Sequence, residues 1–296
     1  MQHSRLSFRN EIKKNKLSSY LLIGIILVVL LALTYIIAFI IGDNYFFLIL
    51  TIGIPISIAY VLIGFYKSDK IAIASTNAKP AKQQEYNQYH NLIEGLCLAS
   101  GLPKPKLYII QDSQINAFAS GRDPKHAIVC VTTGLLEKLN KQEIEGVLAH
   151  ELSHIANYDI RFMTLTAILV GMIAIISQIF LRSLFWSSLS GQNNRENNNA
   201  VLMIIGIILA ILAPIIVALV QLAISRKREY AADSSAVKFT RTPTGLIGAL
   251  TKIKSNKPMK ISGAIAPLFI AKPLRTKEWF STHPSLSERI TRLKKM

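Results

Sequence analysis

The organisation of this chain follows most directly from residues 141–157, which read KQEIEGVLAHELSHIAN. Apolar side chains recur there at the spacing of an α-helix, so we expect a helix with one face for packing. The apolar positions are Ile144, Val147, Leu148 and Ile155. His150 and His154 are four residues apart and therefore share a face of that helix. Glu151 directly follows the first histidine.

Two imidazoles on one helix face can bind one zinc ion. The pattern His-Glu-x-x-His is typical of metallopeptidases, in which the glutamate takes a proton from water activated by the metal. We therefore expect His150 and His154 to bind a single zinc ion and Glu151 to be the general base. A catalytic zinc ion normally has three protein ligands, so a third must come from elsewhere.

The best candidate for the third ligand is Glu229, at the head of the run EYAAD, residues 229–233. Glu229 and Asp233 are four residues apart and point the same way on a helix. Asp233 could accept a hydrogen bond from a ligand imidazole and fix its tautomer. The same spacing fits an exposed carboxylate that pairs with Arg226 or Lys227. Spacing alone leaves both interpretations open.

Four runs are long and apolar enough to cross a bilayer, which takes about 20 helical residues. They cover about residues 20–41, 45–65, 163–185 and 201–224, and none carries a charge at its centre. Hydrophobic residues make up 51% of the chain and charged residues 17%, with the charges crowded outside these runs. Charge-free runs of this length are rare in water-soluble folds, so buried helices of a large soluble domain are the weaker interpretation. We expect a mainly α-helical, multi-pass membrane protein with a small β-sheet.

The formal net charge of +17 is best explained by membrane topology. Basic residues flank the apolar runs, and no basic motif interleaved with aromatics suggests a nucleic-acid partner. Residues 5–16 and 226–295 are basic, whereas residues 42–44 carry no lysine or arginine and residues 187–200 carry only Arg195. Both termini and residues 66–162 should therefore lie on the cytoplasmic side of the cell membrane. The basic excess should contact anionic lipid head groups.

The chain divides into four parts on this interpretation. Residues 1–66 hold a cytoplasmic segment and a transmembrane hairpin, and residues 67–162 hold the first part of a cytoplasmic catalytic domain. Residues 163–224 hold spans three and four with an external loop, and residues 225–296 complete the catalytic domain. If spans three and four pack together, Glu229 comes beside the two histidines at the cytoplasmic membrane surface.

The polar segments have recognisable elements of their own. Cys97 and Cys130 lie in no C-x-x-C motif, so we expect buried thiols. We expect helices at 83–100, 141–157, 225–239, 244–253 and 286–293, strands at 106–111 and 126–132, and an extended segment at 116–119.

Together these motifs resemble the HtpX family of bacterial membrane zinc proteases, relatives of the CAAX prenyl endopeptidases. The resemblance covers nearly the whole chain. Its motifs are the paired N-terminal spans, Asn116-Ala117-Phe118-Ala119 before Gly121, His150 through Asp159, Ser225 through Tyr230 ahead of Asp233, and Thr282-His283-Pro284-Ser285. The resemblance implies a zincin-like domain, one zinc ion with Glu229 as its third ligand, and quality control of membrane proteins, which would be its substrates.

The resemblance also assigns supporting residues. It implies that Asn116, Ala117, Phe118 and Ala119 form an edge strand on which an extended substrate lies. It implies that Asn157 supports the metal ligands as Asp233 does. It places His283 near the active site, where a donor aimed at the oxyanion would lower the barrier. Arg228 and Arg289 are weaker candidates for that task, since arginines at a basic membrane face are usually explained by lipid.

Four other functions compete with a quality-control protease. CAAX-type processing is the alternative within the same chemistry. A zinc transporter needs polar ligands within its spans, which offer Gln178 and Gln221 but no histidine or aspartate. A site-2-type intramembrane protease would carry the motif inside a span, but charged residues immediately precede this one. An inactive scaffold is disfavoured because Glu151 is present.

Overall fold

A computed structural model describes residues 8–41, 43–167, 226–256, 268–270 and 284–296, with isolated residues at 178, 182 and 206. Most of the expected third span and nearly all of the fourth lie outside these residues, and so does His283. Within the described residues the protein is mainly helical with one small mixed sheet, which confirms the predicted class.

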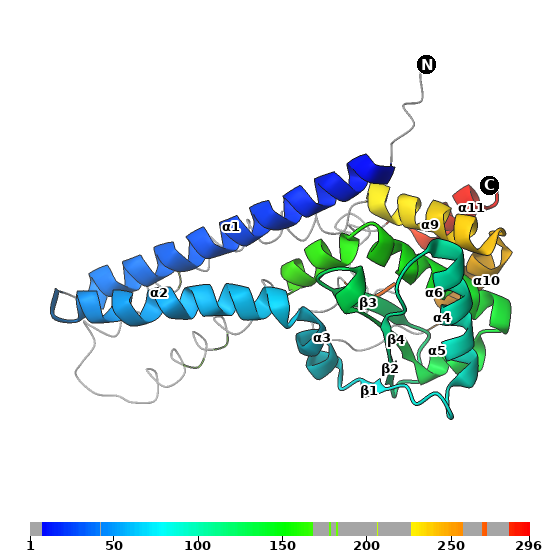
Figure 1. The fold of residues 1–296 in the computed structure, drawn as a ribbon, viewed down its shortest axis with the longest axis horizontal. Helices are drawn as coiled ribbons and strands as arrows, with labels where there is room; N and C mark the ends of the chain where they lie inside the picture. Colours follow the sequence, from blue (N-terminus) through cyan, green and yellow to red (C-terminus); the bar gives the residue numbers. More distant parts are fainter. Residues whose placement is uncertain are drawn as a thin grey trace, which may run out of the picture.

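Two long helices, α1 (Phe8–Ile41) and α2 (Asp43–Tyr66), form a hairpin that projects from one side of a rounded domain (Figure 1). Both are long and apolar enough to cross a membrane. Large apolar side chains point outward along them; Phe39 is 71% exposed and Phe47 77%. The hairpin agrees with the first two expected spans. However, α1 begins at Phe8, so residues 8–16 are helical too, and Asn15 reaches the domain.

The sheet has the strand order β1-β2-β4-β3. β2 and β4 are parallel, and the two outer strands run antiparallel to their neighbours. The strands are β1 (Lys79–Pro80), β2 (Lys106–Ile110), β3 (Ala117–Gly121) and β4 (Ala127–Thr132). The predicted strands and the predicted extended segment are therefore confirmed. β3 is an outer strand of this sheet, as expected for the segment at 116–119.

The two faces of the sheet pack into different cores. Ala117, Ala119 and Val129 belong to the larger core, which includes side chains of α4 (Asn87–Ser100) and α6 (Lys141–Ala156). Phe118 and Cys130 belong to a smaller core on the other face, where the ring centroid of Phe118 lies 4.8 Å from that of Phe269. Successive residues of β3 thus face opposite cores, because side chains alternate along a strand. Cys97 and Cys130 are free and buried, as predicted.

Helix α6 lies at the centre of the domain. It starts at a capping box, in which Asn140 and Glu143 each bond the backbone of the other. α9 (Arg226–Thr240) and α10 (Thr244–Ser255) pack against it. A Cβ atom on Gly245 would lie 2.1 Å from the Gln142 carbonyl oxygen, and one on Gly146 would lie 2.5 Å from the Leu246 nitrogen. Glycine at these two positions lets α10 approach α6 closely.

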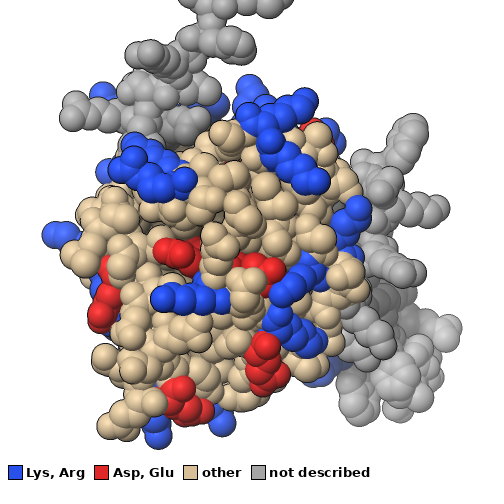
Figure 2. All heavy atoms as spheres, turned by 90° about the vertical axis from the view of Figure 1, so that its right-hand side faces the viewer, with Lys and Arg blue, Asp and Glu red and all other residues tan. Residues whose placement is uncertain are grey.

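The remaining elements are short. They are α3 (Ser68–Thr76), η1 (Pro124–His126), α5 (Thr133–Lys138) and α11 (Leu286–Leu293). The first three of these and β1 were not predicted, because elements this short carry little periodicity. Helix α4 starts about one turn later than predicted, since residues 83–86 form turns before Asn87. The end of the domain away from the hairpin carries lysine and arginine side chains along its upper and right-hand parts, with acidic side chains among them (Figure 2). Mixed charge of this kind is typical of a surface in water.

Candidate active site

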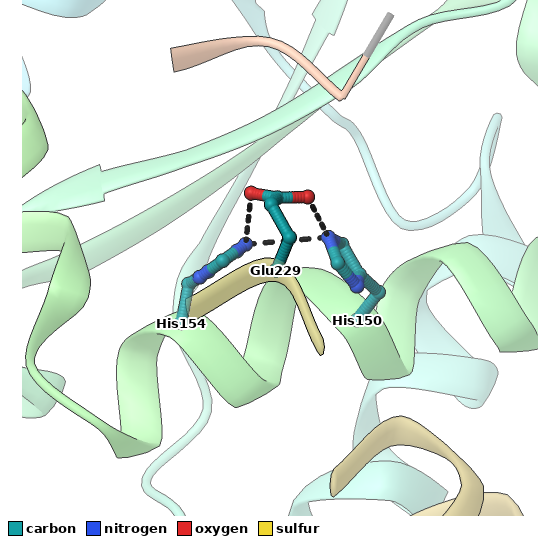
Figure 3. Close-up of side chains that lie close together, drawn as sticks. All are labelled: His150, His154 and Glu229. Carbon is teal, nitrogen blue, oxygen red and sulfur yellow. Dashed lines mark hydrogen bonds and ion pairs between the residues drawn. The ribbon is translucent and has the colours of Figure 1, made fainter. Parts of the chain in front are cut away.

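Three buried side chains from two helices converge at one point (Figure 3). His150 and His154 extend from α6, and Glu229 from the first turn of α9. The two Nε2 atoms are 3.2 Å apart. The carboxylate of Glu229 has one oxygen 3.6 Å from His150 Nε2 and the other 3.7 Å from His154 Nε2. One ligand atom from each residue lies within 4.8 Å of the others, so the cluster could bind a metal ion.

Small side chains bring α9 close enough for this convergence. Ala232 and Ala236 of α9 are buried, and the two helices pack together. A helix surface of alanines lets a neighbouring helix approach, which places Glu229 over the histidine face of α6. Its charged neighbours Arg226 and Lys227 are exposed, whereas Glu229 is only 5% exposed. The interpretation of Glu229 as an exposed carboxylate is therefore wrong.

The donor set fits zinc. Ligand atoms about 2.0–2.1 Å from a tetrahedral zinc ion lie about 3.3 Å from one another, close to the separations seen here. Each Nδ1 faces a carboxylate, so each imidazole carries its proton on Nδ1 and leaves the Nε2 lone pair free. Two lone pairs 3.2 Å apart repel unless a cation or a proton lies between them. Two histidines and one glutamate are also a ligand set of known catalytic zinc sites.

The two carboxylates behind the histidines come from different places. Asp233 Oδ1 lies 3.0 Å from His150 Nδ1, in the arrangement that the sequence analysis proposed. Asp159 Oδ2 lies 3.1 Å from His154 Nδ1, and this partner was missed. Asn157 was expected in this role. Its backbone oxygen accepts a hydrogen bond from Asn15, and its side-chain oxygen has no hydrogen-bond partner among the described residues.

A sharp turn after α6 brings Asp159 back towards His154. α6 ends at Ala156, and Tyr158 then adopts a φ of 60°, which is rare for a bulky residue. The helix that follows resumes at residue 159. Asn15 of α1 fixes the turn from the other side, with its Nδ2 donating to Asp159 Oδ1 at 2.7 Å. The hairpin therefore contacts the histidine site through one intermediate carboxylate.

Arg289 of α11 joins the acidic residues on the opposite side. Its Nε and Nη2 donate to the two oxygens of Asp233 at 2.9 and 2.6 Å, and its Nη1 lies 3.0 Å from Glu229. The side chain is 2% exposed. The expectation that Arg289 faces lipid is wrong, because its guanidinium pairs with buried carboxylates. Arg228 is partly buried and lies 3.7 Å from Asp159.

Burial and charge set the protonation of the two histidines in opposite directions. Burial lowers the pKa of His150, and the charge of Arg289 lowers it further. Burial also acts to lower the pKa of His154. There, the hydrogen bond that the ring donates to Asp159 and the charge of Glu229 outweigh burial and raise the pKa of His154 to about 9.

Glu151 lies between the histidines in the sequence and beside β3 in space. It is 2% exposed, and the backbone N–H of Ala119 donates a hydrogen bond to its carboxylate. Burial raises the pKa of Glu151 to about 7, with Glu229 adding to the rise and His154 opposing it. A carboxyl group with a pKa near neutrality is suited to taking and returning a proton.

The outer edge of β3 already binds one backbone group. The N–H of Ile270 donates to the Ala117 carbonyl at 3.1 Å, on the side away from β4. Asn116 bonds towards β4 instead, since its backbone oxygen accepts from the Thr132 N–H. The side chain of Phe118 packs in the smaller core. Of the four residues expected to bind substrate, Ala117 and Ala119 turn their backbone groups to the outer edge.

Comparisons with known proteins agree with the geometry. The model for Peptidase family M48 matches residues 83–296. A "Protease HtpX homolog" of Thermoanaerobacter pseudethanolicus is 48% identical over 81% of this chain and 82% of its own. Another from Dictyoglomus turgidum is 40% identical over 98% of this chain and 95% of its own. A crystal structure of S. mikatae Ste24p covers 80% of this chain and 56% of that one, with 21% identity and a TM-score of 0.48.

Proposed function

Because this chain belongs to peptidase family M48 and is a membrane metalloprotease, we propose that it is a zinc endopeptidase that cleaves protein substrates at the cytoplasmic face of the membrane. The observation that carries the proposal is the convergence of His150, His154 and Glu229, with a carboxylate behind each imidazole. These backing carboxylates engage the Nδ1 side of each ring and so direct each Nε2 towards the shared point, where it would bind a metal ion.

Each residue of the site has a distinct task in this proposal. A zinc ion held by the three ligands would polarise a water molecule and the carbonyl of the scissile peptide bond. Glu151 takes the proton from that water and returns it to the nitrogen of the leaving amine. The N–H of Ala119 orients the Glu151 carboxylate for both transfers. Arg289 is a positioning residue, since it holds Asp233 against His150.

The substrate would lie along the outer edge of β3. An exposed strand edge offers unpaired backbone groups to an extended peptide. The Ile270 to Ala117 hydrogen bond supports this idea, because a carbonyl on this edge already accepts from a backbone N–H outside the sheet. Ala119, on the same edge, is bonded to the proposed base, so a peptide there would pass close to Glu151. Asn116 and Phe118 would then shape the strand without contacting the peptide backbone.

Three further assignments belong to the proposal. His283 would donate to the oxyanion that forms during hydrolysis, and Asn157 would help to position His154. Both termini would be cytoplasmic, with spans three and four completing a four-helix anchor against membrane lipid. The natural substrates would be damaged or misfolded membrane proteins.

Metal removal and replacement test the central claim. The purified full chain should hydrolyse casein, lose that activity with a zinc chelator, and regain it when one equivalent of zinc is added per chain. Glu229→Gln should lower zinc affinity, since a neutral amide is a poorer ligand than a carboxylate. Full zinc occupancy of Glu229→Gln under a competing chelator would remove Glu229 from the ligand set. Cleavage restricted to prenylated peptides would favour the CAAX-type alternative, and zinc flux without hydrolysis would favour a transporter.

A pair of single cysteines tests the orientation. Asp43, at the start of α2, and Lys141, at the start of α6, are both exposed. A membrane-impermeant thiol reagent should label Asp43→Cys in intact cells and should label Lys141→Cys only after lysis. The native Cys97 and Cys130 are buried, so background labelling should be low. Labelling of Lys141→Cys from outside would reverse the proposed orientation.

A further inference from the structure

A pocket of about 410 Å³ lies where the start of α1 meets the turn after α6. It lies apart from the three metal-ligand candidates, none of which lines it. Its polar and aromatic lining comes from three parts of the chain: Lys16 and Tyr20 of α1, Asp123 and Lys125 near η1, and Tyr158 and Arg161 after α6.

Arg161 is the feature of this pocket that calls for a ligand. Its side chain is 7% exposed, and its Nε donates to the Arg122 carbonyl at 2.7 Å. Its Nη1 has no hydrogen-bond partner among the described residues. A buried guanidinium donor without an acceptor is costly, so such groups are nearly always paired. The missing partner is an acceptor, and an anion would satisfy both the donor and the charge.

The charges around the pocket also favour an anion. Lys16, Lys125 and Arg161 bring three positive charges, and Asp123 brings one negative charge, which leaves a net charge of +2. Asp123 is already engaged by its neighbours. It accepts hydrogen bonds from the backbone N–H of His126 at 3.0 Å and from its Nδ1 at 2.8 Å, and it lies 3.5 Å from Arg122. These partners largely compensate the negative charge of Asp123. An incoming anion would therefore be attracted mainly by the three cations.

The level of the pocket relative to the hairpin identifies the source of the anion. The Arg161 guanidinium lies 5.4 Å from the ring centroids of both Tyr20 and Phe65. Phe65 is in the last turn of α2, and Tyr20 lies where the apolar part of α1 begins. Both rings mark the place where the helices leave the hydrocarbon, and aromatic residues are enriched at that level. Lipid phosphates occupy the same level, so a lipid head group can reach Arg161 without leaving the bilayer.

We propose that this pocket binds the phosphodiester of an anionic phospholipid. The Arg161 Nη1 donates to a phosphate oxygen, and Lys16 and Lys125 supply further charge. Tyr158 forms one wall, and the Lys16 ammonium already lies 4.2 Å from its ring centroid. This inference rests on the membrane location in the proposed function and not on proteolysis.

Lipid binding by the purified full chain tests the proposal. The protein would be delipidated in a neutral detergent and titrated with phosphatidylglycerol or phosphatidylcholine, with bound lipid counted by native mass spectrometry. We expect a clear preference for phosphatidylglycerol. Arg161→Gln should weaken that binding by about tenfold or more, since a charged hydrogen bond is lost. Lys125→Gln, at an exposed position, should weaken it by about fivefold.

The controls separate a specific site from general attraction. Arg292→Gln removes an exposed arginine whose guanidinium lies 3.9 Å from the Tyr230 ring centroid, away from this pocket, and should bind lipid like the unmodified protein. Glu151→Gln should do the same, so failure of the protease assignment would leave this result unaffected. If Arg161→Gln does not fold, Lys125→Gln and Lys16→Gln decide the question.

Three outcomes would overturn the proposal. They are equal binding of both lipids, undiminished binding by the pocket variants, and equal losses in Arg292→Gln. Inorganic phosphate and glycerol 3-phosphate are titrated in parallel. Protection against thermal unfolding by either one at concentrations as low as those of the lipid would assign the pocket to a free phosphate and would refute the lipid assignment.

Discussion

The two histidines of the candidate centre are supported by two different regions of the molecule. Behind His150, Asp233 of α9 is clamped by the buried guanidinium of Arg289 through two hydrogen bonds. Behind His154, Asp159 is held by the neutral amide of Asn15, which belongs to the first membrane helix. One half of the site is thus secured by buried charge within the domain, and the other by a hydrogen bond from the membrane anchor. The strength and the origin of this support differ, although both imidazoles are candidate ligands of the same metal ion.

Replacing Glu151, which supports neither histidine, should give the largest loss of activity. In Glu151→Gln the amide cannot take a proton, while both backing carboxylates and the three ligand candidates remain. We expect hydrolysis of a quenched peptide to fall by about 10²–10⁴-fold. Zinc content by metal analysis should stay near one per chain. Activity at the unmodified rate would show that Glu151 is not the base.

Removing Arg289, the cation that clamps Asp233 behind His150, should give the largest loss of stability. Arg289→Ala leaves Asp233 and Glu229 buried without their shared cation, which typically costs about 3–5 kcal/mol. Thermal unfolding in detergent should therefore occur at a clearly lower Tm, and zinc should be held less tightly. Arg289→Lys should recover part of the loss, because it restores the charge but not the paired hydrogen bonds.

Arg292→Ala, one turn or less along α11 but exposed, is the matched control for Arg289→Ala. It should leave both Tm and zinc affinity nearly unchanged. Equal losses of Tm and zinc affinity in the two variants would mean that helix α11 as a whole, and not the Arg289 guanidinium, stabilises the site.

Replacing the two carboxylates one at a time compares the halves directly. Asp233→Asn and Asp159→Asn should each weaken zinc binding by about 10–100-fold, the usual effect of removing such a partner. Asp233→Asn should also lower Tm, since Arg289 loses its main counter-charge. Asp159→Asn should lower Tm less, because the arginine that pairs with it, Arg228, lies 3.7 Å away and is partly exposed. The reverse order of Tm values would contradict this comparison.

Removing the Asn15 amide, which holds Asp159 from the membrane hairpin, should have the smallest effect on zinc affinity. Asn15→Ala removes two donated hydrogen bonds, to Asp159 and to the Asn157 carbonyl, each worth about 0.5–1.5 kcal/mol. We expect a several-fold loss in zinc affinity with little change in KM. Ser18→Ala, on the same helix, is the control. A normal zinc affinity in Asn15→Ala would mean that Asp159 needs no support from α1.

The parts of the site that follow from local spacing could be predicted from the sequence. His150, Glu151 and His154 lie within one helical repeat, and that helix is found at residues 141–156. Asp233 was found because it lies four residues after Glu229. Such relations are fixed by the geometry of a single helix.

The residues that were missed act between elements. Asp159 reaches His154 only because Tyr158 adopts a positive φ, and no spacing rule predicts that turn. Arg289 reaches Asp233 because α11 packs beside α9, 56 residues away in the sequence. A pattern of charges near a membrane face pointed to lipid for Arg289, since sequence shows the charge of a side chain but not its partner. For Arg161, no sequence pattern indicates an unpaired donor in a pocket.

The hydrogen bonds of Asn15 have a practical consequence for protein production. Preparations of membrane enzymes are often simplified by expressing only the water-soluble part, here the chain after Tyr66. Such a fragment would keep all three ligand candidates and Glu151, yet it would lack the amide that holds Asp159. It would also lose the contact between the Lys16 ammonium and the Tyr158 ring. Measurements of zinc affinity on this protein therefore call for the hairpin and a detergent or bilayer around it, because Asn15 of the anchor supports the carboxylate behind His154.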